Sequence, residues 1–285
     1  MSQIENKNSN PLAGFFRQPR IYITLPSKGQ FYPNGSLDMP ESGEIPVYAM
    51  TARDELMFKT PDALMNGTST VEVIKSCLPN IKNPWLIPSI DLDAILCAIR
   101  IATYGHEMEV SSTCPKCESH NDHSIDLRAV LDNFKNIQFR TKVVIEDIIV
   151  VNLQPLNYDQ ISKAGLKAFE HQKIFSVIND SSINDEQKVK LFQESFVKLT
   201  DLTFETVAQC ITSIESPNGA TSDKEFITEF LRNTDKRVFN ELNKVLEDTK
   251  KSATMPSLEV ECSDCKHSYQ IALTLDHSDF FGKGF

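Results

Sequence analysis

The chain is organised by two short cysteine motifs, Thr113-Cys-Pro-Lys-Cys-Glu118 and Glu261-Cys-Ser-Asp-Cys-Lys266. Each motif is a Cys-x₂-Cys knuckle with a strand-like stretch on either side. These stretches cover residues 108–113 and 120–127 for the first knuckle, and 258–261 and 268–275 for the second. Two hairpins with thiolate pairs at their tips can face each other and offer four sulfur ligands in a tetrahedron, which suits structural Zn²⁺. The sequence therefore predicts one zinc site made by Cys114, Cys117, Cys262 and Cys265.

The two knuckles lie far apart in the sequence, with 144 residues, 118–261, between them. Loop-closure entropy grows slowly with length, and zinc binding to small modules contributes about 10–16 kcal/mol, so one ion can close so long an excursion. We therefore expect an α+β fold with a β-rich N-terminal region and a mainly helical domain inserted between the knuckles. The expected parts are an extended arm (1–20), an N-terminal α+β region (21–105), a composite zinc ribbon (106–130 plus 256–277), a hairpin plus helical insertion (131–255) and an aromatic tail (278–285).

The composition is that of an ordinary globular chain, with 40% hydrophobic and 24% charged residues among 285. No apolar run approaches the roughly 18 residues of a membrane helix, and the polar N-terminus lacks the apolar core of a signal peptide. The seven cysteines are therefore expected to be thiols or ligands, with disulfides in the two pairs as the alternative. A net charge of −10 repels phosphate backbones, so a nucleic-acid partner is not expected.

The N-terminal arm ends in the apolar stretch Pro11-Leu-Ala-Gly-Phe-Phe16. Such an arm does not fold alone, so Phe15 and Phe16 either pack on the body, which is the first expectation, or bind a partner. The tail carries Phe280, Phe281 and Phe285, for which packing on the body and insertion into a neighbouring subunit are both open.

Region 21–105 contains two strand patterns followed by helices. The strands are expected at 21–25 and 44–50, and the helices from Thr51, at 70–77 and at 89–103. The last helix is the most apolar and should be central, with a stop at Gly105. Its acids Asp91 and Asp93, like Asp54 and Glu55, are expected to cap helix beginnings rather than to perform acid–base chemistry.

The insertion begins with a hairpin pattern at 137–145 and 148–153. Amphipathic helices are then expected at 157–178, 185–199, 204–214, 223–231 and 235–246, with 250–256 as the linker back to the second knuckle. This spacing is typical of a helical bundle.

A metal held by four thiolates has no open coordination position, so its expected role is structural. His120, His123 and His267 are alternative ligands, although with four cysteines present we expect them outside the first coordination shell. Cys77, Cys97 and Cys210 have no partner at ligand spacing. The sequence contains no phosphate loop, no nucleophile elbow and no zinc-protease motif, and we do not expect an enzyme. It does not distinguish zinc from iron.

Three stretches resemble a known protein family. They are Leu25-Pro-Ser-Lys-Gly-Gln-Phe-Tyr-Pro33, Met50-Thr-Ala-Arg-Asp-Glu55 and Ala98-Ile-Arg-Ile-Ala-Thr-Tyr-Gly105, followed by the first knuckle. Together they resemble baseplate hub and hub-assembly proteins of T-even-like contractile-tailed bacteriophages, over about residues 20–130. The resemblance implies a role in building the tail baseplate, in the virion after assembly in the host cytoplasm, with other hub and tail proteins as partners.

The main hypothesis is therefore a zinc-stabilised structural and interaction protein of a phage tail. One alternative is a transient assembly chaperone that is missing from the finished virion. The other is a zinc-ribbon regulator that binds nucleic acid, against which the acidic balance counts.

Overall fold

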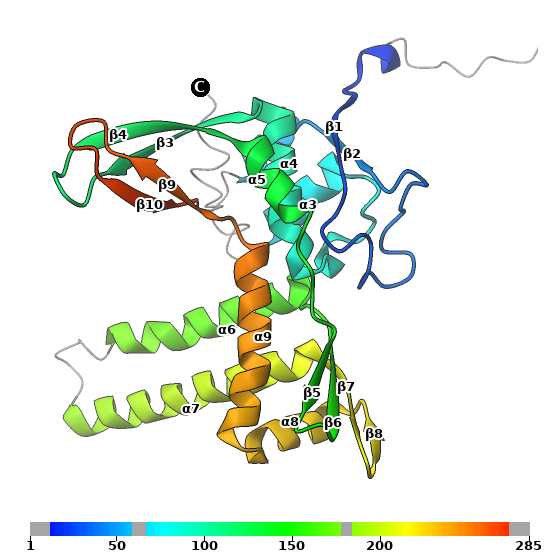
Figure 1. Ribbon diagram of the computed structural model, residues 1–285, viewed down its shortest axis with the longest axis vertical. Coiled ribbons are helices and arrows are strands. Elements are labelled where there is room, and N and C mark those ends of the chain that lie inside the picture. Colours follow the sequence, from blue (N-terminus) through cyan, green and yellow to red (C-terminus); the bar gives the residue numbers. More distant parts are fainter. Residues whose placement is uncertain (1–11, 59–66, 178–183, 274–285) are drawn as a thin grey trace, which may run out of the picture.

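A computed structural model describes residues 12–58, 67–177 and 184–273 of the chain. The elements gather around three apolar clusters, in an N-terminal body, a pair of hairpins and an insertion (Figure 1). The α+β class expected from the sequence is confirmed. Within these residues, no helix combines the length and the apolar character needed to cross a membrane.

Helix α4 (Ser89–Tyr104) is the central element of the N-terminal body. Apolar residues around much of its circumference are buried, as the sequence predicts, and Gly105 follows it at φ +92°. A two-stranded antiparallel ribbon of β1 (Pro19–Ile23) and β2 (Ile45–Tyr48) packs against this helix. The remaining elements of the body are η1 (Ala13–Phe15), α1 (Ala52–Phe58), α3 (Thr68–Cys77) and η2 (Pro84–Leu86).

The buried carboxylate of Asp91 holds the loop that joins β1 to β2. It accepts hydrogen bonds from the backbone N–H of Ser27 at 2.7 Å and from the Ser27 hydroxyl at 2.5 Å. Burial raises the pKa of Asp91 to about 6, against the lowering effect of these bonds. The expected capping role is therefore wrong for Asp91, which binds a segment distant in sequence. Asp54 does cap its own helix, because it exchanges hydrogen bonds with Thr51.

Two antiparallel hairpins carry the cysteine motifs at their tips. The first pairs β3 (Glu107–Thr113) with β4 (His120–Asp126), and the second pairs β9 (Ser257–Glu261) with β10 (Ser268–Ala272). They extend side by side from the body (Figure 1). Helix α5 (Leu127–Phe134) follows β4 directly and was not expected from the sequence. Its N-cap is Asp126, whose side chain accepts from the N–H of Arg128, and its apolar face buries Phe134 between the hairpins and α4.

The insertion contains a four-stranded antiparallel sheet as well as helices. The strand order is β5 (Lys142–Ile145), β6 (Ile149–Leu153), β7 (Ile211–Ser216) and β8 (Gly219–Thr221). The helices are α6 (Tyr158–Val177), α7 (Asp185–Cys210), α8 (Lys224–Asn233) and α9 (Lys236–Ala253). The sheet shares one apolar cluster with α7, α8 and α9.

Two helix predictions in the insertion were wrong. The helices expected at 185–199 and 204–214 are one continuous helix, α7, which ends at Cys210. The hydroxyls of Thr200 and Thr203 bond to carbonyls one turn earlier, so these threonines continue the helix rather than interrupt it. Residues 211–216 then form β7, which pairs with β6. The expected linker is also shorter, because α9 continues to Ala253 with Lys250 and Lys251 in its last turn, where cations are favourable.

Both ends of the insertion are attached to the body near the beginning of α4. At the entry, the N–H of Ser89 donates to Leu156 O at 2.7 Å and the N–H of Tyr158 donates to Ile87 O at 2.9 Å. The ring of Tyr158 also stacks on Trp85, with centroids 5.6 Å apart. At the exit from α9, the N–H of Met255 donates to Asp93 at 3.0 Å. These contacts fix the direction in which the chain leaves and re-enters the body.

Candidate metal centre

The four cysteines predicted to bind a metal are brought together at the tips of the two hairpins. The sulfurs of Cys114, Cys117, Cys262 and Cys265 all lie within 4.8 Å of one another. Cys114 is 3.7 Å from Cys265, and Cys117 is 3.6 Å from Cys262. A regular tetrahedron with metal–sulfur distances of about 2.3 Å has edges of about 3.8 Å, whereas a disulfide needs about 2.05 Å. The arrangement therefore fits a tetrahedral metal ion and not two disulfides.

The two knuckles have the same backbone geometry. In the first, the N–H of Cys114 donates to Ser119 O, and the N–H of Glu118 donates back to Cys114 O. In the second, Cys262 makes the corresponding pair of bonds with His267 and Lys266. The residue after the second cysteine is left-handed in both, with φ +59° at Glu118 and +56° at Lys266. This repeat turns both sulfurs of each knuckle toward the other hairpin.

Asn121 joins the two knuckles to each other and is almost fully buried. Its Oδ1 accepts from the backbone N–H and the hydroxyl of Ser263, both at 2.8 Å. Its Nδ2 donates to Ser119 O at 3.0 Å and faces the sulfur of Cys262 at 3.6 Å. An N–H that points at a ligand sulfur stabilises the thiolate, so Asn121 supports the centre from outside the ligand set. Sequence reasoning missed it, because one asparagine on a strand carries no spacing signal.

The backbone amides of the second knuckle favour a thiolate at Cys262. Hydrogen bonds from the N–H groups of Cys265 and then of Asp264 lower the pKa of Cys262 to about 6, against the raising effect of burial. A thiolate is the form in which cysteine binds a metal.

The histidines near the knuckles have other contacts. His123 Nε2 lies 3.1 Å from the Ser112 hydroxyl, which in turn lies 2.6 Å from the hydroxyl of Tyr269. The ring of His267 stacks on Tyr269. This cluster links β3 and β4 to β10 below the metal centre. Among the described residues the group with metal-ligand geometry there consists of the four cysteines alone.

The remaining cysteines are buried at three separate places in the fold. Burial raises the pKa of each to about 12, so Cys77, Cys97 and Cys210 are protonated thiols.

The aromatic residues of the N-terminal arm are exposed. Phe15 is 85% exposed and Phe16 58%, so the expectation that they pack on the body is wrong. Phe280, Phe281 and Phe285 lie outside the described residues.

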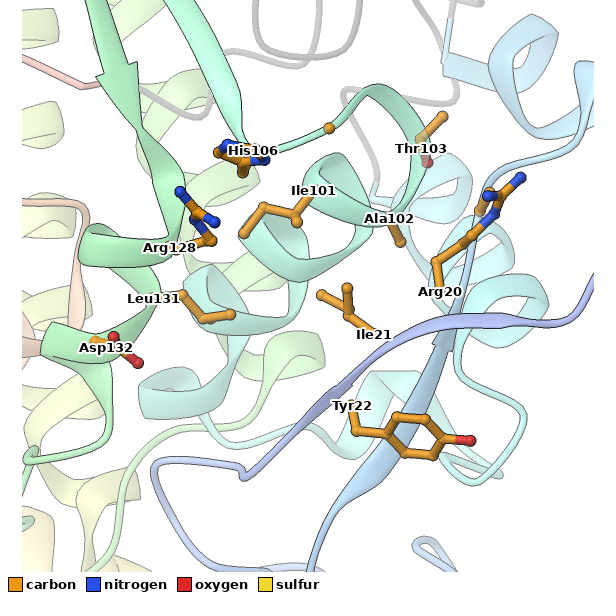
Figure 2. Close-up of a pocket in the computed structure, with 12 residues that line it drawn as sticks. Arg20, Ile21, Tyr22, Ile101, Ala102, Thr103, His106, Arg128, Leu131 and Asp132 are labelled. Carbon is orange, nitrogen blue, oxygen red and sulfur yellow. The ribbon is translucent and has the colours of Figure 1, made fainter.

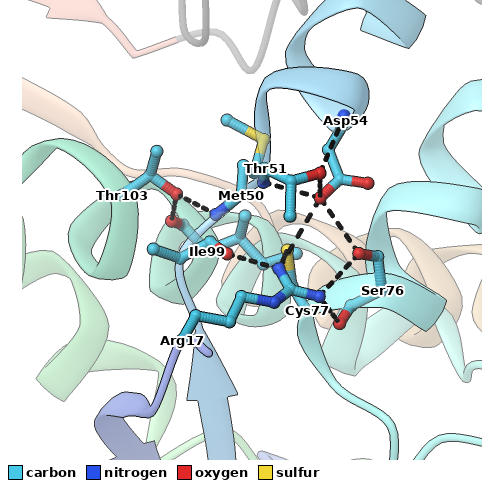
Figure 3. Close-up of polar contacts among 9 residues, drawn as sticks. Arg17, Met50, Thr51, Asp54, Ser76, Cys77, Ile99 and Thr103 are labelled. Atoms are coloured by element: carbon cyan, nitrogen blue, oxygen red, sulfur yellow. Dashed lines mark hydrogen bonds and ion pairs between the residues drawn. The ribbon is translucent and has the colours of Figure 1, made fainter. Parts of the chain in front are cut away.

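Arg17 fastens the arm to the body directly after these rings (Figure 3). Its guanidinium donates to Ala49 O, and to Ser76 O and Oγ at 2.6 and 2.8 Å. It also pairs with the buried carboxylate of Asp54 at 3.6 Å. Bonds from one guanidinium to α1, to α3 and to the residue after β2 fix the point from which Phe15 and Phe16 project.

A comparison with protein families gives one match that covers most of the chain. The family model described as T4 bacteriophage base plate protein matches residues 19–282, which include both knuckles and everything between them. Searches of curated proteins and of solved structures gave no match.

Proposed function

The chain belongs to the family of T4 bacteriophage base plate proteins, and on this premise we propose that it is a structural component of the baseplate hub. Its task there is to hold neighbouring hub and tail proteins in place within the virion tail, after assembly in the cytoplasm of the host. The observation that carries this proposal is the extent of the family match, which runs from the first strand through both cysteine motifs. The four cysteines and the residues between the two motifs therefore lie within the region that the family model matches.

The four-sulfur cluster supports a structural zinc ion as part of this role. Four cysteine sulfurs within 4.8 Å of one another suit Zn²⁺, and they also suit iron. When bound, the ion would cross-link two hairpins that are otherwise joined by hydrogen bonds. Metal analysis of native protein tests this assignment. We expect about one zinc per chain, and four freely reactive thiols without metal would refute it.

The exposed rings of the N-terminal arm support the interaction part of the proposal. Phe15 and Phe16 project from a point that Arg17 fixes, and a contiguous exposed apolar group is typical of a protein–protein contact. We assign the same role to Phe280, Phe281 and Phe285. Arms of this kind would bind a neighbouring protein instead of packing on the body of their own chain.

Mass spectrometry of purified virions separates a hub component from a transient assembly chaperone. A component is present in the mature particle at a fixed ratio to other baseplate proteins, whereas a chaperone is absent from it. A third role, binding of nucleic acid by the hairpins, would require a salt-dependent shift with DNA at physiological ionic strength. The net charge of −10 opposes that role.

A further inference from the structure

A groove with a cavity of about 670 Å³ lies between β1 and α5, over the last turns of α4 (Figure 2). Its base is apolar and is formed by Ile21, Ile101, Ala102 and Leu131. Arg20 lies on one side of it, and Arg128 and Asp132 lie on the other. The groove is therefore an apolar channel with polar walls, and one wall is a β-strand.

The strand that forms this wall has a free edge. β1 pairs only with β2 in its two-stranded sheet, and Tyr22 is opposite Pro46. Because proline has no N–H, Tyr22 and Pro46 must be a non-hydrogen-bonded pair, and the bonds are carried by Ile21–Val47 and Ile23–Ile45. The N–H and C=O of Tyr22 then point away from β2. Neither group has a backbone partner outside the β1–β2 ladder among the residues that the structure describes. An unpaired strand edge is a template for another strand.

The charges along the groove differ in whether they have partners. Arg128 makes a close pair with Asp126, 2.7 Å between Nη2 and Oδ2, and Asp132 pairs with Lys135 at 2.6 Å. These charges are largely neutralised. Arg20 is exposed and has no acidic partner in the described part of the chain. It is therefore the position at which the groove attracts a carboxylate.

We propose that this groove binds an extended, acidic segment of a neighbouring baseplate protein, which adds to β1 as a third strand. The main chain of the segment would bond to Tyr22, a carboxylate would face Arg20, and a branched apolar side chain would cover Ile101. This is recognition by strand addition, in which backbone bonds supply affinity and side-chain pockets supply specificity. The proposal rests on the baseplate role, since it takes the partner from that assembly.

The test uses the full chain and overlapping 15-residue synthetic peptides that cover the other baseplate and tail proteins of the same virus. Binding is measured by fluorescence anisotropy for the wild type, for Arg20→Glu, and for Arg53→Glu as a matched control on the exposed face of α1. We expect an acidic peptide whose affinity falls at least about tenfold with Arg20→Glu and stays unchanged with Arg53→Glu. Replacing the peptide's carboxylate residue by lysine should restore binding to Arg20→Glu. Thermal melts of both variants establish that they are folded.

A second measurement reports the backbone bonds directly. Amide hydrogen exchange at Tyr22 should slow at least about tenfold in the peptide complex, whereas Ile23, whose amide already faces Ile45, should change little. Peptides that bind equally well to Arg20→Glu, that bind as helices, or that leave Tyr22 exchange unchanged would overturn the proposal, and so would the absence of any bound peptide. Failure of the baseplate role itself is distinguishable, because then the full chain would not associate with baseplate proteins in the assembled tail.

Discussion

The sulfurs of Cys114 and Cys265 lie 3.7 Å apart although 151 positions separate them in the sequence. The first cysteine of one knuckle faces the second cysteine of the other, and Cys117 faces Cys262 in the same crossed way. The two knuckles therefore face each other in opposite directions. Each supplies two of the four sulfurs, so neither knuckle alone can complete a tetrahedron.

Replacement of one ligand should remove the metal and loosen both hairpins. For Cys262→Ser we expect zinc to fall from about one per chain to near zero. The free energy of unfolding should fall by about 2–5 kcal/mol, the range seen when a covalent cross-link is removed. Metal analysis and denaturant unfolding measure the two effects. Cys77→Ala, which changes a buried thiol outside the centre, should keep its zinc, and equal zinc in both variants would contradict the assignment.

Asn121 should affect metal affinity without being a ligand. Asn121→Ala leaves Ser263 N–H and the Cys262 sulfur without their partner, so zinc affinity should fall about 10–100-fold. Stability should fall by about 0.5–1.5 kcal/mol, because the Ser263 N–H loses its part-buried hydrogen bond. Competition with a chromogenic chelator measures the affinity. The control is Asn240→Ala, an exposed asparagine on α9, for which both values should stay at the wild-type level.

Loss of Arg17 should release the arm. Arg17→Ala removes bonds to Ala49 and Ser76 and leaves Asp54 without its cation, so we expect a loss of about 1–3 kcal/mol in stability. Chymotrypsin should also cleave after Phe15 or Phe16 faster than in the wild type. Arg20→Ala serves as the control, since its guanidinium makes no comparable contacts in the described residues. Unchanged cleavage in Arg17→Ala would mean that the arm is held by something else.

Asp93 should make stability depend on pH in the opposite sense to an ordinary surface carboxylate. Burial raises its pKa from 3.8 to about 6, partly offset by the hydrogen bond from Met255. The folded state therefore binds the proton more tightly, so this contribution favours folding below pH 4 and is lost as the pH rises to about 6. Between pH 4 and 7, the free energy of unfolding should fall less in Asp93→Asn than in the wild type, by up to about 3 kcal/mol. The exposed Asp248→Asn provides the comparison, and identical pH profiles of the two variants would refute this account.

The aromatic termini should matter more for assembly than for folding. Phe15→Ser with Phe16→Ser should leave the melting temperature within about 2 °C, because both rings are exposed. Removal of 280–285 should likewise weaken assembly more than it lowers the melting temperature. Incorporation into tails, scored by complementation and by virion mass spectrometry, is the readout. A doubly substituted chain that assembles normally would show that the arm is dispensable.

The meeting of the four cysteines was predictable because they carry a spacing signal that survives a long insertion. The most apolar helix, α4, was predictable for a similar reason, because its apolar residues already indicate which positions are buried. By contrast, α7 and β7 meet at Cys210 and Ile211, where nothing in the local pattern marks a change from helix to strand. Pairing with β6 decides that change, and such pairing is a tertiary effect.

The supporting residues were the least predictable part. Asn121, Arg17 and Asp91 each act through a partner at least 59 positions away in one of their bonds, so no window of sequence contains the interaction. The division of the chain into arm, body, ribbon, insertion and tail stays a prediction.

The hydrogen bond between Asp93 and Met255 holds the C-terminal end of α9 against α4. The helix is about 27 Å long, from 18 residues at about 1.5 Å each, and it leads within a few residues into the strand that ends beside Cys262. A tilt of about 10° at its far end displaces that end by about 5 Å, while the pinned end converts the motion into rotation of the β9–β10 hairpin. With a metal bound between them, the β3–β4 hairpin must rotate together with the β9–β10 hairpin. A mechanical load on the insertion would therefore rotate both hairpins as one unit.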